Sequence, residues 1–342
     1  RILIFDEPTA VLVPQEVDDL FNALKGLRAE GMAIIFISHK LDEVLRVADD
    51  VTVVRAGSTV AQVKSKDVTA RQLAELMVGS ELPQPTTHGD TRRPEVTLSL
   101  KDVSVPTKSG SRDLISHISF DLQVGEVIGI AGVEGNGQAE LVEAIMGLRD
   151  YTGQIEFKGE NIDRYSVAHR HDAGIGLIPE DRQRQALMMN SPLWENRILG
   201  HQRSKPVMRG FILDKKATIA DTRVIMDEFD VRAPGPHTLA TALSGGNQQK
   251  FIVGREMSKA PALLVASHPT RGVDVGAQAA IWDELRGARE KGMAIVLISA
   301  DLEELIGMSD RLLVMLRGAI TAELNPQKTT PEQLGSAMTG AQ

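Results

Sequence analysis

The feature that most constrains this chain is an internal repeat that links its two ends. When the sequence is shifted by 261 positions, "GMAIIFIS" (31–38) falls on "GMAIVLIS" (292–299). The Pro-Thr pair at 8–9 falls on the pair at 269–270, and about two dozen identities occur without a gap. A repeated sequence of this kind indicates a repeated fold, so the two ends are expected to adopt the same structure.

The repeat divides the chain into unequal parts. Residues 1–80 are predicted to be the C-terminal part of a first domain, and residues 97–342 a complete second domain. Between them, "ELPQPTTHGDTRRPEV" (81–96) is rich in Pro, Thr and charge, which is typical of a linker. The second copy starts near Leu98 and reaches its own "LLVASHPTRG" at 263–272. By analogy between the copies, we expect about 160 residues to precede the first one.

The second copy alternates short strands with helices. Strand-like segments such as "EVIGIAG", "GIGLIP", "ALLVA", "AIVLIS" and "RLLVML" are separated by helical stretches such as 277–291. This alternation predicts an α/β domain with a parallel-sheet core flanked by helices. Upstream, "LSLKDVSV" and "LISHISFDLQVGE" alternate with period two, which predicts an antiparallel β subdomain. Residues 187–235 predict a helical subdomain.

Composition excludes several classes of protein. The net charge of −8 and the isoelectric point near 5.6 argue against a nucleic-acid binder, whose surface is basic. The absence of cysteine excludes disulfides and thiolate zinc sites. No stretch approaches 18 consecutive apolar residues, so no segment is predicted to span a membrane.

A glycine-rich turn follows the predicted strand "EVIGI". In "GVEGNGQAEL", glycines lead into a helix with the spacing of a phosphate-binding loop, whose backbone N–H groups hold phosphate oxygens. The Lys and the Ser or Thr that should follow, for phosphate charge and Mg²⁺, are replaced by a neutral amide and a methyl group. A tight turn without a ligand is the alternative interpretation. The candidate residues of this degenerate loop are Gly132, Gly135, Asn136, Gly137, Gln138 and Ala139.

Two further motifs carry polar groups. "LSGGNQQK" (243–250) leads into a helix whose N-terminus would attract an anion. Asp6 and Glu7 end the strand in "ILIFDEPTA", where a carboxylate pair either forms a surface turn or serves a metal and a water molecule. The second copy carries Ser267 and His268 at the aligned positions.

Together these motifs make the chain resemble the nucleotide-binding domains of ABC transporters, which are P-loop NTPases. "GVEGNGQA" resembles the Walker A loop, "LSGGNQQK" the family signature, and "ILIFDEPTA" the Walker B strand. "FISHKLDEV" resembles the switch-histidine region, and "GLIPEDR" (176–182) stands where the Q-loop faces a membrane partner. The combination of "IPEDR", "PTRGVDVGA" and "LISADLEEL" looks like the branch that imports simple sugars and nucleosides, with nucleosides favoured.

The resemblance implies roles for the matching residues. Asp6 would hold Mg²⁺, Glu7 would polarise the attacking water, and His39 would contact the γ-phosphate of ATP. Asp274 would lie in the D-loop, with a simple helix cap as the alternative. The signature residues that would contact ATP are Ser244, Gly245, Gly246 and Asn247. The candidates for permease contact, with a solvated turn as the alternative, are Pro179, Glu180, Asp181 and Arg182.

The second domain has lost the chemistry that the first retains. Ser267, His268 and Ala300 replace the acids and the switch histidine, and Pro-Thr at 106–107 leaves no aromatic side chain for adenine. In the family, ATP lies between the Walker motifs of one domain and the signature of the other. One competent composite site per full-length polypeptide is therefore implied. Because these 342 residues lack the first Walker A motif, we expect no appreciable ATPase activity from them alone.

The resemblance implies the ATP- and Mg²⁺-dependent, energy-coupling subunit of a bacterial-type importer for nucleosides or simple sugars. The expected partners are transmembrane permease subunits and, indirectly, an extracytoplasmic substrate-binding protein, but neither nucleic acid nor zinc. The expected location is the cytoplasmic face of the cell membrane, as a peripheral subunit. Two alternatives stay open: a soluble twin-domain ATPase acting in translation or repair, and a non-catalytic nucleotide-binding module.

Overall fold

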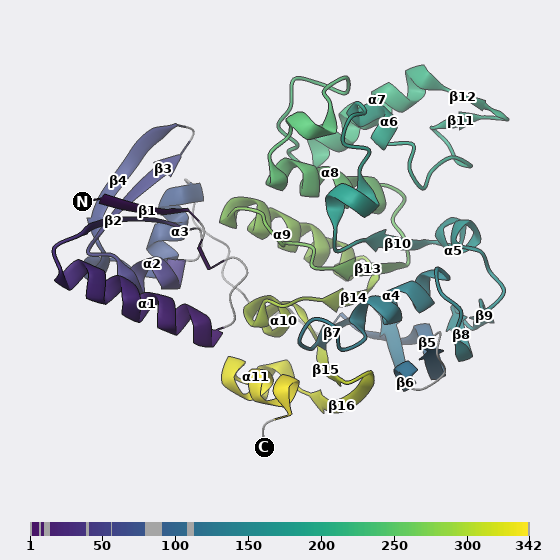
Figure 1. The fold of residues 1–342 in the computed structure, drawn as a ribbon. Helices are drawn as coiled ribbons and strands as arrows, with labels where there is room; N and C mark the ends of the chain where they lie inside the picture. The colour runs from purple at the N-terminus through teal and green to yellow at the C-terminus, as the bar shows by residue number, and fades with distance from the viewer. Residues whose placement is uncertain are drawn as a thin grey trace. The chain divides into compact units, whose positions relative to one another are not determined.

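The computed structural model divides into two compact units (Figure 1). Unit 1 comprises residues 1–84 and 274–279, and unit 2 comprises residues 85–273 and 280–342. No helix in the described part of the chain is long and apolar enough to cross a membrane. The structure describes residues 2–6, 8–9, 14–38, 41–55, 57–78, 91–107 and 113–340.

Unit 1 is an α/β body with its apolar side chains gathered on one side of its helices. β1 pairs with β2 in parallel, and β3 pairs with β4 antiparallel. Phe21 and Leu73 are fully buried, and Val44, Val51 and Val53 form one cluster with Leu73. The elements are β1 (Ile2–Asp6), α1 (Pro14–Ala29), β2 (Ala33–Ile37), α2 (Leu41–Val47), β3 (Asp50–Arg55), β4 (Ser58–Lys64) and α3 (Ala70–Val78).

A six-stranded sheet forms the centre of unit 2 within residues 113–340, in the order β10-β13-β14-β7-β15-β16. Neighbouring strands are parallel except for the antiparallel pair β15–β16. β13 and β14 are buried along their whole length, which explains their continuous apolar sequences. The strands are β7 (Val127–Ala131), β10 (Ile175–Ile178), β13 (Leu263–Ser267), β14 (Ala294–Ile298), β15 (Arg311–Leu316) and β16 (Ala319–Leu324).

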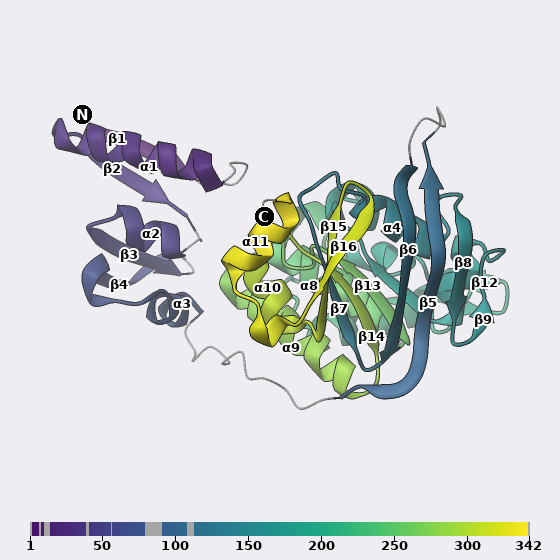
Figure 2. The same ribbon diagram turned by 90° about the horizontal axis from the view of Figure 1, so that it is seen from below.

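The two faces of this sheet support two separate apolar cores. One face packs against the helices that carry Phe251, Ile281, Leu305 and Leu334. The other face packs against α4 and a four-stranded antiparallel sheet, in the order β6-β5-β8-β9, whose long strands are seen in Figure 2. These elements are β5 (Arg93–Pro106), β6 (Asp113–Val124), α4 (Gln138–Met146), β8 (Thr152–Phe157), β9 (Glu160–Asn161), α9 (Val275–Glu290), α10 (Leu302–Met308) and α11 (Pro331–Thr339).

A helical subdomain is inserted between β10 and β13. It carries a short hairpin, β11–β12, before its longest helix. The α/β fold predicted from the sequence, with a parallel-sheet core, an antiparallel β subdomain and a helical subdomain, is thus confirmed. The elements around the insertion are α5 (Val167–Ala173), α6 (Leu193–Asn196), β11 (Met208–Arg209), β12 (Ile212–Leu213), α7 (Lys215–Glu228) and α8 (Gly245–Met257).

The internal repeat is reproduced in the structure element by element. α1, α2 and α3 each reappear 261 residues later as α9, α10 and α11, with identical lengths. An ion pair between Arg28 and Asp49 (2.7 Å) has its counterpart between Arg289 and Asp310 (2.6 Å). Even the irregularity in the β3–β4 pairing recurs at the same place in β15–β16. The identities between the two copies therefore mark positions that determine the fold.

The two copies differ in what lies beside their repeated strands. In unit 2, β7 lies between β14 and β15 and bonds to both. In unit 1, a cavity of about 960 Å³ separates β2 from β3, and its lining includes 34–37 and 51–54. Ile2 and Ile4 of β1 are 68% and 66% exposed, whereas the aligned residues of β13 are fully buried in the core that includes α4 and the antiparallel sheet.

Candidate functional site

The predicted phosphate-binding loop joins β7 to α4 with the backbone that its glycines require. Gly135 and Gly137 have φ of +88° and +108°, in the left-handed region where side chains are disfavoured. A Cβ atom on Gly132 would lie 2.7 Å from the backbone carbonyl oxygen of Met315, so a side chain there would displace backbone. The loop therefore has the expected geometry of a strand–loop–helix turn.

The side chain of Gln138 is buried and folds back into this loop. Its Oε1 accepts a hydrogen bond from the backbone N–H of Asn136 (3.2 Å), and its Nε2 donates to the carbonyl of Val133 (3.2 Å). The loop is also tied to β15–β16, because the backbone N–H of Arg317 donates to Oδ1 of Asn136 (2.6 Å). One backbone donor of the loop is therefore satisfied internally, and the methyl group of Ala139 offers no metal ligand.

At the end of β13, Ser267 and His268 stand at the positions aligned with Asp6 and Glu7. Ser267 is buried, and His268 has a φ of +49°. Nδ1 of His268 accepts a hydrogen bond from the backbone N–H of Ala300 (3.3 Å). Burial lowers the pKa of His268 below its ordinary value. The ring is thus a neutral acceptor for backbone, and neither residue supplies a carboxylate for a metal.

The signature segment forms the N-terminus of α8. Ser244 is the exposed N-cap, and its Oγ accepts hydrogen bonds from the backbone N–H (3.4 Å) and the side-chain Nδ2 (3.0 Å) of Asn247. Oδ1 of Asn247 in turn accepts from the backbone N–H of Arg232 (2.8 Å). Gly246 is buried in the first turn. The N-terminus of this helix is therefore held in one conformation, with Ser244 facing solvent.

Arg182 connects the 179–182 loop to the signature. Its guanidinium donates to the carbonyls of Arg271 (2.6 Å) and Gly272 (3.2 Å), and to Oε1 of Gln248 on α8 (3.3 Å). A Cβ atom on Gly245 would lie 2.7 Å from this guanidinium. Burial lowers the pKa of Arg182. Arg182 is thus bonded within its own unit, and its predicted contact with a permease is not tested by these bonds.

The neighbouring charges of that loop also have intramolecular partners. Glu180 forms an ion pair with Arg271 (2.6 Å). Oδ1 of Asp181 accepts from the backbone N–H groups of residues 183 and 184, and Pro179 is half-buried. Asp274 caps α9, because its Oδ1 accepts from the backbone N–H of Ala277 (3.0 Å). These bonds do not test the D-loop role or the permease contacts, which stay predictions.

The acidic site of unit 1 is described only in part. Asp6 is exposed at the end of β1. Glu7 and His39 lie outside the described residues. Oγ1 of Thr9 donates to Oε2 of Glu43 (2.5 Å), and the aligned Thr270 donates to Oε1 of Glu304 (2.9 Å). The same bond thus links the ends of equivalent elements in both copies.

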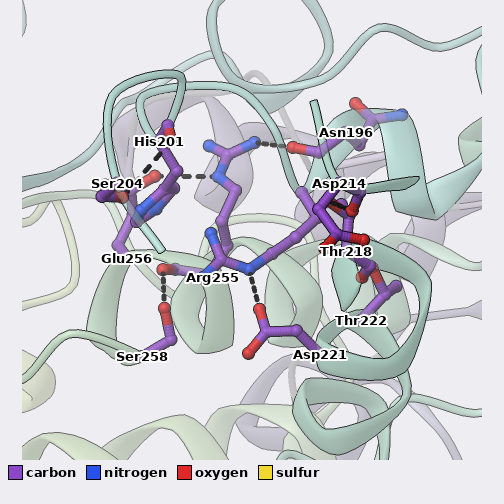
Figure 3. A network of polar contacts seen from close by, with 11 residues as sticks. Asn196, His201, Ser204, Asp214, Thr218, Asp221, Thr222, Arg255, Glu256 and Ser258 are labelled. Atoms are coloured by element: carbon purple, nitrogen blue, oxygen red, sulfur yellow. Dashed lines mark hydrogen bonds and ion pairs between the residues drawn. The ribbon is translucent and has the colours of Figure 1, made fainter. Parts of the chain in front are cut away.

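Sequence reasoning missed a buried polar network behind the signature helix (Figure 3). Nη1 of Arg255 donates to the carbonyls of Ala186 (2.7 Å) and Asn196 (3.3 Å), and its Nε donates to Oε1 of Glu256 (2.9 Å). Nε of Arg197 lies 2.5 Å from Oδ2 of Asp221 on α7. These contacts join α8 to the segment that follows the 179–182 loop. The only signal in the sequence is the pair Arg255-Glu256, which follows the apolar stretch 251–253 near the end of α8.

Comparisons with known proteins agree with this geometry. Residues 115–271 match the family described as ABC transporter. The chain is 41% identical over 340 residues to the nucleoside import ATP-binding protein NupA of Lactococcus lactis, covering 99% of this chain and 67% of that protein. It is 42% identical to the glucose import ATP-binding protein TsgD13 of Haloferax volcanii, of which it covers 62%. The chain thus spans about two thirds of the length of these relatives.

Solved structures show the same fold. A structure of the ATP-binding subunit of an ABC transporter matches 71% of this chain and 99% of its own, with a TM-score of 0.58 and 19% identity. The ADP conformation of MJ1267, an ATP-binding cassette of an ABC transporter, matches 71% of this chain and 95% of its own, with a TM-score of 0.58 and 20% identity.

Proposed function

This chain belongs to the ABC transporter family of ATP-binding proteins, and from that premise we propose that it supplies the energy-coupling ATPase of an importer for nucleosides or simple sugars. The observation that carries the proposal is a contrast within unit 2. The turn at Ser244 is intact and faces solvent, whereas Gln138 fills the phosphate loop of the same unit. A domain with this combination is suited to complete a nucleotide site whose Walker motifs lie elsewhere.

The competent site in this proposal combines residues from both copies. Asp6 and Glu7 supply the carboxylates, His39 contacts the γ-phosphate, and Ser244 to Asn247 bind the phosphates from the opposite side. An exposed carboxylate at a strand end, as at Asp6, fits Mg²⁺, which prefers oxygen ligands. When bound, Mg²⁺ neutralises charge on the phosphate oxygens. Ser267 and Ala139 do not fit that ion, so the second site is inactive in hydrolysis.

Partners and solute follow from the relatives. Relatives that are 36–42% identical in sequence are named for the import of nucleosides, glucose, ribose and xylose. We infer that the subunit works with membrane permease components, at the cytoplasmic face of the membrane, and that an extracytoplasmic substrate-binding protein delivers the solute. The loop at 179–182 and Asp274 are proposed as contacts that respond to the permease and to the opposite domain. The alternative role in translation or repair is not supported by any of these relatives.

The test is ATP hydrolysis by the full-length protein that contains these residues. Glu7→Gln should lower kcat about 100-fold or more, because general-base catalysis contributes on that scale. The matched control is His268→Gln, the aligned position of the second copy, which should leave kcat within about twofold. If hydrolysis survives Glu7→Gln but falls with His268→Gln, the catalytic carboxylate of the competent site is not in the first copy, and the proposal is wrong.

A further inference from the structure

The β11–β12 hairpin carries the most exposed apolar side chain in the described part of the chain. Phe211 is 103% exposed and the adjacent Ile212 is 75% exposed. Arg209 pairs with Ile212, so the turn consists of Gly210 and Phe211 alone. Gly210 has a φ of +66°, as a two-residue hairpin with glycine in its first turn position requires. The hairpin therefore presents a large apolar group at its tip, at the outer edge of unit 2 (Figure 1).

The surroundings of this tip are basic, although the whole chain carries a net charge of −8. No acidic residue occurs from 202 to 213, and the cations flanking the tip are exposed. Within the described residues, no ion pair neutralises Lys205, Arg209 or Lys216. Arg203 lies 3.8 Å from Asp172, a long and exposed pair, and Lys215 lies over the ring of Trp194. The nearest acid in sequence, Asp214, turns inward to cap α7.

The hairpin is mounted firmly on the helical subdomain. The backbone N–H of Asp214 donates to the carbonyl of Val207 (2.9 Å), and Val207 is fully buried. Oδ1 of Asp214 accepts from the backbone N–H of Ala217 (2.9 Å), and the carbonyl of Asp214 accepts from Oγ1 of Thr218 (2.8 Å). Figure 3 shows Asp214 and Thr218 beside the buried network that reaches α8. These hydrogen bonds anchor the end of the hairpin to the N-terminus of α7.

We propose that the 203–216 hairpin binds an anionic lipid surface, with Phe211 and Ile212 entering the interface and the flanking cations contacting the headgroups. Apolar side chains next to Lys and Arg are the composition that binds anionic membrane surfaces. Charge complementarity favours lipid over the cytoplasmic loops of a membrane protein, because such loops themselves carry an excess of Lys and Arg. The hairpin then orients unit 2 at the membrane surface through α7. This binding is independent of ATP hydrolysis.

Vesicle flotation with the 342-residue chain tests the proposal. Vesicles of phosphatidylcholine with 30 mol% phosphatidylglycerol are compared with pure phosphatidylcholine at low salt. The chain should bind the anionic vesicles, and 1 M salt should release it because the Debye length falls to about 3 Å. Phe211→Ser should lower the partition coefficient about tenfold, and each of Lys205→Gln and Arg209→Gln about fivefold.

Matched changes outside the hairpin serve as controls. Leu148→Ser removes an exposed apolar side chain, and Arg164→Gln removes an exposed cation. Neither should alter the partition, and all of these variants should keep the wild-type unfolding midpoint because the side chains are exposed. Equal binding to both vesicle types, or an unchanged partition in Phe211→Ser, would overturn the proposal. The proposal would also be wrong if wild type did not bind anionic vesicles and a hairpin variant lost its association with the permease. The hairpin would then be a contact with protein.

Discussion

Acid should destabilise unit 2 through His201, a buried histidine near the start of the hairpin segment. The residue is 1% exposed, and neither ring nitrogen has a hydrogen-bond partner among the described residues. Its ring meets that of His171 edge to face, with centroids 5.0 Å apart. Burial, and next the nearby charge of Arg197, lower the pKa of His201 to about 2. The folded state therefore holds this side chain neutral.

The magnitude follows from the difference in proton binding. In the unfolded chain the pKa of a histidine is about 6.5, so at lower pH the unfolded state binds a proton that the folded state excludes. The contribution of His201 is therefore fully present above about pH 6.5 and is lost as the pH falls. The slope rises from about half of 1.4 kcal/mol per pH unit at pH 6.5, where the unfolded histidine is half protonated, to the full value at lower pH. Wild type should therefore lose about 2 kcal/mol between pH 6.5 and 4.5 relative to His201→Leu.

A second group should steepen the loss at lower pH. Burial alone would raise the pKa of Glu256, but the charge of Arg255 and the contact with His171 outweigh it and hold the pKa at about 2. Because this folded-state pKa lies below the ordinary carboxyl value, the contribution of Glu256 is lost as the pH falls below about 4.5. Comparison of wild type with His201→Leu at pH 6.5 and 4.5 therefore isolates His201, because His268 contributes equally to both proteins.

The assay is urea unfolding followed by tryptophan fluorescence. The chain has only two tryptophans, Trp194 and Trp282, and both lie in unit 2, so the signal reports that unit. The exposed His237 supplies the matched control as His237→Leu, which should keep the wild-type pH dependence. If the free energies of unfolding of wild type and His201→Leu change equally with pH across this range, the reasoning is refuted. His201 would then bind a proton equally well in the folded and unfolded states.

Three further changes test other contacts. Arg255→Met should lower the stability of unit 2 by about 3 kcal/mol, measured in the same urea assay, because it leaves Glu256 buried without its cation; adding Glu256→Gln should recover part of the loss. Thr270→Val should cost about 1–3 kcal/mol, since it removes a hydrogen bond to the buried Glu304, whose pKa is raised by burial. Gln138→Lys should raise the affinity of unit 2 for ADP about tenfold by calorimetry, because it places a cation in the phosphate loop; an unchanged affinity would mean that the amide is not what limits binding.

The architecture could be predicted from the sequence because the repeat shows each structural signal twice, at aligned positions of the two copies. Gly31 and Gly292, for example, follow the equivalent helices α1 and α9 with φ of +84° and +101°. One glycine could be accidental, but an aligned pair before two apolar strands specifies a helix–turn–strand unit. Periodicity of apolar residues fixed the remaining elements in the same way. The fold could be predicted because its determinants are local.

Arg182 could not be placed from the sequence because its partners are distant along the chain. The carbonyls of Arg271 and Gly272 come about 90 residues later. Within "PEDR", three charged residues have the composition of an exposed turn, since Arg, Asp and Glu are mostly exposed. Arg197 was missed for the same reason, because a fully buried arginine goes against the usual preference. Polar side chains that bond across a domain leave no periodic signal.

The two copies separate residues that maintain the fold from residues that perform chemistry. The bond from Thr9 to Glu43 recurs from Thr270 to Glu304. Asp6, in contrast, is aligned with a serine, although the strands that carry both have the same register. The strand end is therefore stable without a carboxylate, and a residue that can be replaced without loss of the surrounding bonds is not required for folding. An acid retained at such a place in one copy needs another explanation, and the Mg²⁺ site proposed for phosphoryl transfer would provide it.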